Sequence, residues 1–326
     1  MARVLVVAPN WIGDALMAQP LLARLRDKEP ELEIDVLAPE WVAPLARRMP
    51  QVRQVIEAPF RHGALQLRER WRLGRLLARR GYRQAIVLPN SWKSALVPFF
   101  AGIGLRSGYV GEARYGLLNL LYREADGPMS AHYARLADAP DYASREPLAA
   151  PRLRVEPEAI AATLAKFGLS GGYAVLCPGA EYGPAKRWPY FGELAPRLPL
   201  PAVLLGAKND AEAAAGIAGR NLVGETTLDE AIELIAGAAL VVSNDSGLMH
   251  VAAALGRPLV ALFGSSSPER TPPQSAAARV LWLGLECSPC FARECPLGHF
   301  RCLREISVEQ VLGALPPELP AELPRP

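Results

Sequence analysis

The feature that most constrains this chain of 326 residues is a regular alternation of short apolar runs with amphipathic stretches. Apolar runs of this length are typical of buried β-strands, and the stretches between them have the period of helices. A helix between two strands returns the chain to the same end of a sheet, so the strands pair in parallel. The first half therefore predicts a doubly wound α/β domain, with strands at 4–8, 34–38, 52–56 and 84–88 and helices at 15–26, 42–48 and 65–80.

The same alternation restarts in the second half of the chain. Between residues 126 and 158 the periodicity fades into a stretch rich in Ala, Pro, Asp and Arg, which is typical of a domain junction. We therefore predict two Rossmann-like domains, at 1–160 and 161–326, each long enough to bury its own core. In the second domain, strands are predicted at 173–177, 203–205, 240–243 and 259–263, and helices at 191–198, 228–236 and 248–255.

Composition excludes several classes of protein. The chain is 50% hydrophobic and 21% charged, which is ordinary for a globular protein and excludes a disordered or fibrous one. The apolar run near the N-terminus is too short for a signal peptide. No apolar run approaches the roughly 20 residues that span a bilayer. We expect a cytoplasmic protein without a transmembrane helix.

Positive charge is concentrated in the first half of the chain. The net charge is only +3, but residues 61–83 are rich in arginine, and Glu69 is their single acidic residue. This asymmetry indicates an anionic partner. Nucleic acid is one candidate, but no known nucleic-acid module accompanies the arginines, and a phosphorylated lipid or glycolipid at a membrane surface is at least as consistent with them. The alternative is a solvated helix face between 65 and 80.

The first predicted strand leads directly into Pro9-Asn10-Trp11-Ile12-Gly13-Asp14 and then a helix. Ligands of open α/β sheets bind outside the carboxyl ends of the strands, so Asp14 lies at a functional position. The alternative is that Asp14 caps the helix, because Asp is favoured at that position.

A strand exit in the second half leads into a loop that carries Lys186 and Arg187 ahead of a proline-started helix. Such a loop presents cationic side chains and backbone N–H groups to phosphate. It lacks the Gly-Lys-Ser/Thr of a Walker loop, and an ordinary surface loop is the alternative.

The strongest local pattern follows the predicted strand 240–243. Ser246 and Gly247 place small residues where the N-terminus of a helix meets a diphosphate. Asp245 either orients hydroxyl groups or caps this helix, and His250 either donates to a phosphate oxygen or is a core histidine. A further strand exit carries three serines at 265–267, and several such loops together indicate a nucleotide pocket.

Three segments together resemble one known family, the ADP-heptose:lipopolysaccharide heptosyltransferases of glycosyltransferase family 9. They are NWIGDALMAQPLL (10–22), PGAEYGPAKRWP (178–189) and SNDSGLMHVAAALGRPLVALFGSSSP (243–268). A fourth, CSPCFARECPLGHFRCL (287–303), resembles the heptosyltransferase II branch. The resemblance implies the GT-B fold, with two Rossmann-like domains facing a central cleft. It also implies inverting, metal-independent transfer of L-glycero-D-manno-heptose from ADP-heptose to the first heptose of the lipopolysaccharide inner core. The chain has no Asp-x-Asp motif, which agrees with a metal-independent enzyme.

Together with the local patterns, the resemblance indicates which residues are candidates for the site. It favours Asp14 as the catalytic base, and we place Lys186 as the main cation beside the leaving diphosphate. The candidate donor-binding residues are Gly206, Thr226, Thr227, Leu228, Asp245, Ser246, Gly247, Leu248 and His250. The candidate acceptor-binding residues are Arg61, Lys93, Arg106 and Arg114, because arginine suits phosphate and carboxylate recognition.

The implied partners are ADP-heptose, as the donor substrate, and an acceptor oligosaccharide linked to lipid A. We expect no cofactor, no nucleic acid, a monomer, and peripheral contact with the cytoplasmic face of the inner membrane. Two alternatives stay open. One is a related GT-B nucleotide-sugar enzyme with a different acceptor, and the other is a non-catalytic nucleotide-sugar-binding protein.

Four of the five cysteines are close together, at Cys287, Cys290, Cys295 and Cys302, with His299 between them. This spacing allows a structural zinc site. The resemblance supplies no metal role, so we favour reduced thiols and no bound metal. A disulfide is not expected in a cytoplasmic protein.

Overall fold

The computed structural model describes residues 2–61, 63–124, 126–142 and 147–317. The chain forms two compact units, 1–151 and 152–326, and each is described by itself. The division precedes helix α7 (Pro157–Lys166), which lies whole in the second unit and packs on α10 (Leu228–Ala236). The boundary predicted at residue 160 would have divided this helix.

The first unit contains a six-stranded parallel sheet in the order β3-β2-β1-β4-β5-β6. Val6 of β1 pairs with Val36 on one side and with Ile86 on the other. The four predicted strands are confirmed, and β5 and β6 were not predicted. The strands are β1 (Arg3–Val7), β2 (Glu33–Pro39), β3 (Val52–Ala58), β4 (Gln84–Val87), β5 (Leu105–Tyr109) and β6 (Leu120–Tyr122).

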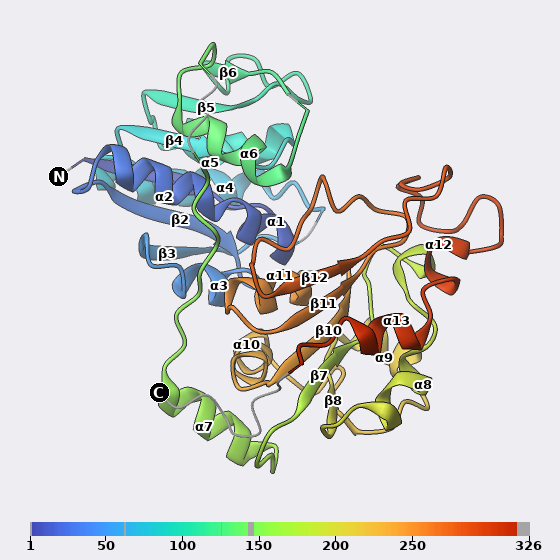
Figure 1. The fold of residues 1–326 in the computed structure, drawn as a ribbon. Coiled ribbons are helices and arrows are strands. Elements are labelled where there is room, and N and C mark those ends of the chain that lie inside the picture. The colour runs from blue at the N-terminus through green and yellow to red at the C-terminus, as the bar shows by residue number, and fades with distance from the viewer. Residues whose placement is uncertain (1, 62, 125, 143–146, 318–326) are drawn as a thin grey trace. The chain divides into compact units, whose positions relative to one another are not determined.

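Helices cover both faces of this sheet (Figure 1). Helix α2 packs on α6, and α4 packs on α5. Right-handed crossovers put these two pairs on opposite faces, because the chain moves outward from β1 to β3 and then from β4 to β6. The helix predicted at 15–26 is two helices. The helices are α1 (Ile12–Met17), α2 (Gln19–Lys28), α3 (Ala43–Arg47), α4 (Leu67–Leu77), α5 (Leu96–Phe100) and α6 (Met129–Ala134), with 3-10 turns η1 (Ala78–Arg80), η2 (Trp92–Ala95) and η3 (Arg135–Ala137).

The second unit repeats this plan with the strand order β12-β11-β10-β7-β8-β9, all parallel. Val242 of β10 pairs with Leu176 and with Val260. The strands are β7 (Ala174–Cys177), β8 (Ala202–Leu204), β9 (Arg220–Asn221), β10 (Leu240–Asn244), β11 (Leu259–Leu262) and β12 (Ala278–Leu281). The further helices are α8 (Phe191–Leu194), α9 (Ala211–Ala214), α11 (Gly247–Ala254), α12 (Arg301–Arg304) and α13 (Val308–Gly313), with 3-10 turns η4 (Pro184–Lys186), η5 (Ala195–Arg197) and η6 (Lys208–Asp210).

Each unit has its own core of buried aliphatic side chains. In the first, Leu5, Ala85 and Val87 on the sheet meet Leu77 and Val97 from the helices. In the second, the inner strands and the helices that pack on them bury a larger apolar cluster, including Leu176, Phe191, Leu204, Val242, Val260 and Leu303. Strands buried on both faces must be apolar throughout, which is why the sequence predicted them.

The strand orders locate the two places where ligands are expected. In the first unit the order reverses between β1 and β4, and in the second between β7 and β10. Loops leaving neighbouring strands in opposite directions open a crevice at such a switch point. Asp14 follows β1, and Lys186 and Asp245 follow β7 and β10.

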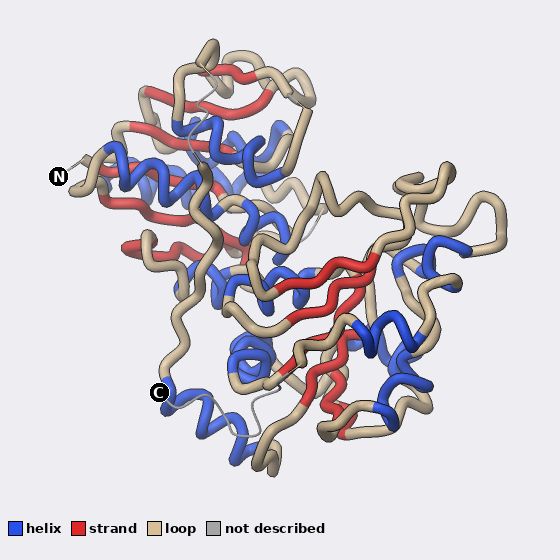
Figure 2. Tube along the Cα trace, viewed as in Figure 1, coloured by secondary structure: helices blue, strands red, loops and turns tan. Residues whose placement is uncertain are grey.

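Within the described part of the chain, no helix is long and apolar enough to cross a bilayer. The stretch between β12 and α12 forms no helix or strand and runs as a loop (Figure 2).

Candidate active site

Asp14 lies in the first turn of α1 but does not cap this helix. The N-cap is Trp11, whose side chain makes no capping hydrogen bond. The Asp14 carboxylate instead accepts a hydrogen bond from the hydroxyl of Tyr133, at 3.1 Å. Tyr133 is buried on α6, so its ring holds the hydroxyl in place. The structure therefore favours a positioned carboxylate over the capping alternative. Tyr133 could not be found from the sequence, because it lies 119 residues from Asp14.

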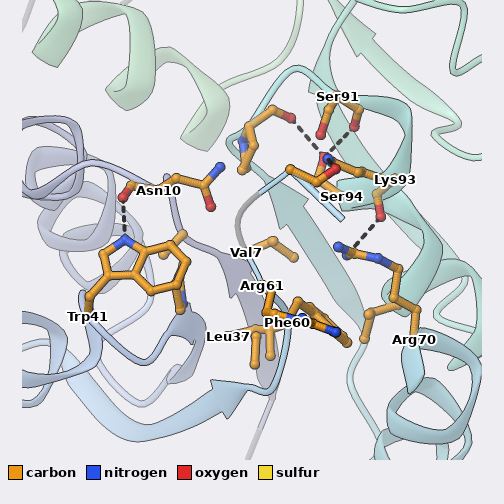
Figure 3. Close-up of a pocket in the computed structure, with 16 residues that line it drawn as sticks. Val7, Asn10, Leu37, Trp41, Phe60, Arg61, Arg70, Ser91, Lys93 and Ser94 are labelled. Atoms are coloured by element: carbon orange, nitrogen blue, oxygen red, sulfur yellow. Dashed lines mark hydrogen bonds between the residues drawn. The ribbon is translucent and has the colours of Figure 1, made fainter. Parts of the chain in front are cut away.

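A pocket of about 260 Å³ opens at the carboxyl ends of β1, β2, β3 and β4 (Figure 3). The indole of Trp41 forms one wall and donates to the backbone oxygen of Asn10, at 2.8 Å. Arg70 lies on the other side, where it donates to the backbone oxygen of Lys93, at 3.2 Å. The pocket thus combines an aromatic wall with fixed polar groups, as small-molecule sites commonly do.

Two of the predicted acceptor-binding residues, Arg61 and Lys93, line this pocket. The Arg61 side chain is exposed, and the Lys93 side chain is half-buried. The Lys93 ammonium donates to the backbone oxygen of Gly63, at 2.7 Å, which holds its charge at the pocket edge. No acidic side chain lines the pocket among the described residues, so its charge is positive.

Arg114, a third predicted acceptor residue, makes hydrogen bonds within the first unit. Its side chain is buried, with 2% exposure, and donates to the backbone oxygen of Tyr109, at 2.7 Å, and to Asn90 Oδ1, at 3.2 Å. It also donates to the backbone oxygen of Pro89. Burial lowers the pKa of Arg114 to about 10. Arg114 therefore holds the loop after β4, which lines the pocket, rather than facing a ligand itself.

Arg106, the fourth predicted acceptor residue, also makes hydrogen bonds within the first unit. Its guanidinium donates to the backbone oxygens of Leu117, at 2.6 Å, and Ile103, at 2.5 Å. The sequence could not separate these arginines from Arg61, because only the folded chain shows which cations already have carbonyl partners.

In the second unit, the Lys186 ammonium pairs with the Asp245 carboxylate, at 2.5 Å. The same carboxylate oxygen accepts from the Ser266 hydroxyl, at 2.5 Å. Asp245 is buried, and these two partners offset the cost of burying its carboxylate. Asp245 is not the cap of α11. The N-cap is Ser246, whose hydroxyl accepts from the backbone N–H of Met249, at 3.4 Å.

Asn244 ties the loop that carries Lys186 to the end of β10. Its amide donates to the backbone oxygen of Pro178, at 2.7 Å, and accepts from the backbone N–H of Trp188, at 3.0 Å. Asn244 is fully buried. The sequence reasoning missed this residue and Ser266, although both stand inside motifs that it had singled out.

His250 lies on α11 beside this cluster and is buried. Burial lowers the pKa of His250 to about 4, and the nearby Asp245 carboxylate only partly opposes this effect. The ring is therefore neutral at neutral pH. Within the described chain, the structure gives this imidazole no hydrogen-bond partner. A core histidine normally has such a partner, so the ring is available to a ligand.

The remaining predicted donor residues lie at two helix starts. Gly247 and Leu248 form the first turn of α11, and its N–H groups point out of the helix N-terminus. Thr227 caps α10 in a reciprocal pair of hydrogen bonds with Glu230, at 3.2 and 2.8 Å. Thr226 precedes this cap, and Leu228 begins the helix. Gly206 accepts from the backbone N–H of Gly224, at 3.0 Å, so the β8 exit lies near the start of α10.

The four clustered cysteines line one pocket of about 280 Å³ together with His299. Burial raises the pKa of Cys302, whereas the Phe300 N–H, which donates to the sulfur, lowers that of Cys295. Among the described residues, no three His, Cys, Asp or Glu side chains are arranged to hold a metal ion. The fifth cysteine, Cys177, lies apart in β7, and burial raises its pKa to about 12.

Comparison with known proteins assigns the chain to a family. The family model for glycosyltransferase family 9 (heptosyltransferase) matches residues 70–301, more than half of the chain. The chain belongs to glycosyltransferase family 9. It is 45% identical to lipopolysaccharide heptosyltransferase 2 of Escherichia coli K12, over 96% of this chain and 97% of that protein. The same enzyme of Salmonella typhimurium is 43% identical over the same shares of both chains.

A solved structure shows the same fold. The E. coli ADP-heptose lps heptosyltransferase II superposes on this family 9 glycosyltransferase with a TM-score of 0.85, at 41% identity. The match covers 96% of this chain and 97% of that chain. The predicted GT-B type of fold, with two parallel α/β units, is thereby confirmed, and so is the predicted enzyme class.

The buried neutral His250 predicts an acid-sensitive stability for this glycosyltransferase. Its pKa is about 4 in the fold and 6.5 as a free side chain, so the unfolded chain binds a proton first as pH falls. Stability from this residue is therefore complete above pH 6.5 and is lost as pH falls toward 4. Between pH 7 and 5, His250→Gln should lose about 2 kcal/mol less unfolding free energy than wild type.

Urea denaturation of both proteins at the two pH values measures this difference. His299→Gln is the matched control, and it should lose as much stability as wild type. Equal losses for wild type and His250→Gln would contradict the neutral, buried state of His250.

Proposed function

We propose that this family 9 glycosyltransferase is a lipopolysaccharide heptosyltransferase II, which transfers heptose from ADP-heptose to the first heptose of the inner core. The observation that carries the proposal is the cluster at the β7/β10 switch point. A lysine ammonium, a neutral histidine without a partner and the start of α11 converge there. Such groups bind a diphosphate without requiring a metal ion. The similarity to heptosyltransferase 2 proteins over both units supports the sugar and the acceptor.

The proposed base is Asp14. As the acceptor oxygen forms its bond to the anomeric carbon, the carboxylate takes the hydroxyl proton, and the bond from that carbon to the diphosphate breaks. Attack opposite the leaving group inverts the anomeric centre. Tyr133 acts as a positioning residue, because its hydroxyl already orients the carboxylate. The proposed base belongs to the first unit, and the proposed diphosphate-binding groups belong to the second.

The leaving ADP gains negative charge, which fixed donors stabilise in the transition state. We assign this work to Lys186, the His250 N–H and the first N–H groups of α11, at Ser246, Gly247 and Leu248. Asp245 and Ser266 hold the Lys186 ammonium in place before the donor binds. No general acid is needed, because a stabilised diphosphate leaves without a proton. We place the adenosine near Gly206 and the start of α10, at Thr226, Thr227 and Leu228.

For the acceptor, we assign the pocket of the first unit. Arg61 and Lys93 would pair with phosphate or carboxylate groups of the core oligosaccharide, and Trp41 would face a sugar ring. An acceptor linked to lipid A lies at a membrane, so we propose peripheral contact at the cytoplasmic face of the inner membrane by a monomer.

The decisive experiment measures transfer from ADP-heptose to a mono-heptosylated lipid A core in the presence of EDTA, for wild type and Asp14→Asn. Wild type should transfer heptose with inversion, and the variant should be about 100-fold slower or worse, because its amide takes up no proton. Asp27→Asn, an exposed aspartate of the same unit, is the control and should match wild type.

Each outcome has a distinct meaning. Wild-type activity that needs added metal contradicts the metal-independent mechanism, and an active Asp14→Asn contradicts the base. Binding of ADP-heptose without transfer favours a different acceptor. Binding without transfer to any acceptor favours a non-catalytic binding protein.

Lys186→Ala should lower turnover about 100-fold or more, because it removes one preorganised charge from the leaving group. The readout is the single-turnover rate of ADP release with saturating donor. Lys166→Ala removes another lysine that pairs with a carboxylate, but on α7, and should keep activity within about twofold. Activity of Lys186→Ala within tenfold of wild type would contradict the role of Lys186.

For the cysteine pocket, we propose reduced thiols without a bound metal. Protein purified without chelators should contain far less than one equivalent of zinc or iron, as measured by elemental mass spectrometry. It should also release no metal when a mercurial reagent titrates the thiols. Stoichiometric metal that Cys290→Ser abolishes would overturn this proposal.

A further inference from the structure

The surface of α4 carries an unusual row of charge. Arg68, Arg72, Arg75 and Arg79 follow each other at spacings of four, three and four residues along α4 and η1. At 3.6 residues per turn, their side chains emerge within about 60° of one another. All four are exposed. The row therefore forms one continuous strip of positive charge, which we call the α4 arginine row.

Among the residues that the structure describes, none pairs with the α4 arginine row. The structure gives these four side chains no ion pair and no hydrogen bond to any described residue. Neighbouring arginines, by contrast, have hydrogen-bond or ion-pair partners. Arg70 donates to the backbone oxygen of Leu65, at 2.6 Å, Arg80 donates to Gln54, at 2.8 Å, and Arg83 pairs with Glu29. Four parallel like charges repel each other unless an external anion neutralises them.

Large apolar side chains border the row on both sides. Trp71 is 50% exposed and Leu67 49% on one side, and Leu76 is 63% exposed on the other. Exposed apolar groups beside arginines are typical of surfaces that lie in a membrane interface. Tryptophan in particular favours the level of the lipid headgroups.

The opposite side of α4 fixes how the helix is presented. Arg70, Gly74 and Leu77 are buried. A methyl group on Gly74 would lie 2.5 Å from Phe100 Cβ and 2.9 Å from the backbone oxygen of Val97, so α4 and α5 are in close contact. This packing fixes the orientation of α4, so its arginine row faces outward. The charged surface is therefore present before any partner binds.

We infer that the α4 arginine row, with Leu67, Trp71 and Leu76, docks this protein on an anionic phospholipid bilayer. The arginines pair with lipid phosphates, while the three apolar side chains enter the interface between headgroups and acyl chains. A nucleic acid would match the charge but would leave the flanking apolar side chains in water. This inference extends the proposed function, because an enzyme with a lipid-linked acceptor must work at a bilayer surface.

The test is cosedimentation of the full-length protein with vesicles, without donor or acceptor. Vesicles of phosphatidylcholine alone are compared with vesicles that also contain phosphatidylglycerol. We expect binding to the anionic vesicles only, weakened by high salt. Each basic residue at such a surface contributes about fivefold in affinity, so Arg72→Gln/Arg75→Gln should bind about 25-fold more weakly. Trp71→Ser/Leu76→Ser should also lose binding, although it keeps every charge.

The matched control is Arg220→Gln/Arg279→Gln, which removes the same net charge from exposed positions in the second unit. It should bind within twofold of wild type. Equal loss in this control would overturn the inference, since binding would then follow net charge alone. So would equal binding to both kinds of vesicle, or tight binding to duplex DNA that the α4 variants lose.

A separate assay distinguishes this inference from the proposed function. With a deacylated, water-soluble acceptor, the α4 variants should transfer heptose within twofold of wild type. Loss of that activity would place α4 in the acceptor site and overturn the docking role. Vesicle binding by a wild-type protein that transfers no heptose would leave the docking surface standing and contradict only the proposed function.

Discussion

Parallel pairing of the strands is the constraint on which both units depend. Because all strands of a unit point the same way, their carboxyl ends meet at one edge, and every functional loop starts there. The reversal of order beside β1 and beside β7 opens a crevice at that edge. Asp14, Lys93 and the Lys186–Asp245 pair all lie after strands that border these reversals, whereas Arg61 reaches the same pocket as Lys93 from the end of the edge strand β3. The chemistry is thus positioned by backbone pairing first and by side-chain contacts second.

Burial then sets the charge of His250 and makes a partner necessary for Asp245. His250 is neutral because its buried site disfavours a cation, so in the proposed mechanism it would offer one N–H to the diphosphate without adding charge. Lys186 keeps a counter-ion of its own in Asp245, and a buried carboxylate without that partner would be strongly destabilising. The Lys186 ammonium and the Ser266 hydroxyl are both held by the Asp245 carboxylate. Preorganised donors of this kind stabilise a transition state without reorganisation during the reaction.

Sequence reasoning reached most of the fold because buried parallel strands must be continuous apolar runs. It missed β5, since Arg106, Ser107 and Gly108 interrupt the apolar pattern, and a side chain at Gly108 would meet the backbone oxygen of Val87 at 2.8 Å. For the candidate arginines, the sequence showed only a positive charge and did not show which groups each side chain contacts. Arg106 and Arg114 turned out to hold backbone carbonyls, whereas Arg61 lines a pocket. The type of a residue does not reveal which hydrogen-bond partners the folded chain brings next to it.

The sequence by itself determined the two α/β units, the order of their functional loops and the family, because periodicity and local motifs are properties of neighbouring residues. Only the tertiary structure decided that Tyr133 meets Asp14, that Asn244 ties down the Lys186 loop, and that Asp245 binds a lysine instead of capping a helix. It also decided that the four arginines along α4 and η1 are exposed and make no ion pair or hydrogen bond with any described residue. These facts join residues far apart in the chain, and burial and geometry fix them only after the sheets and helices have packed.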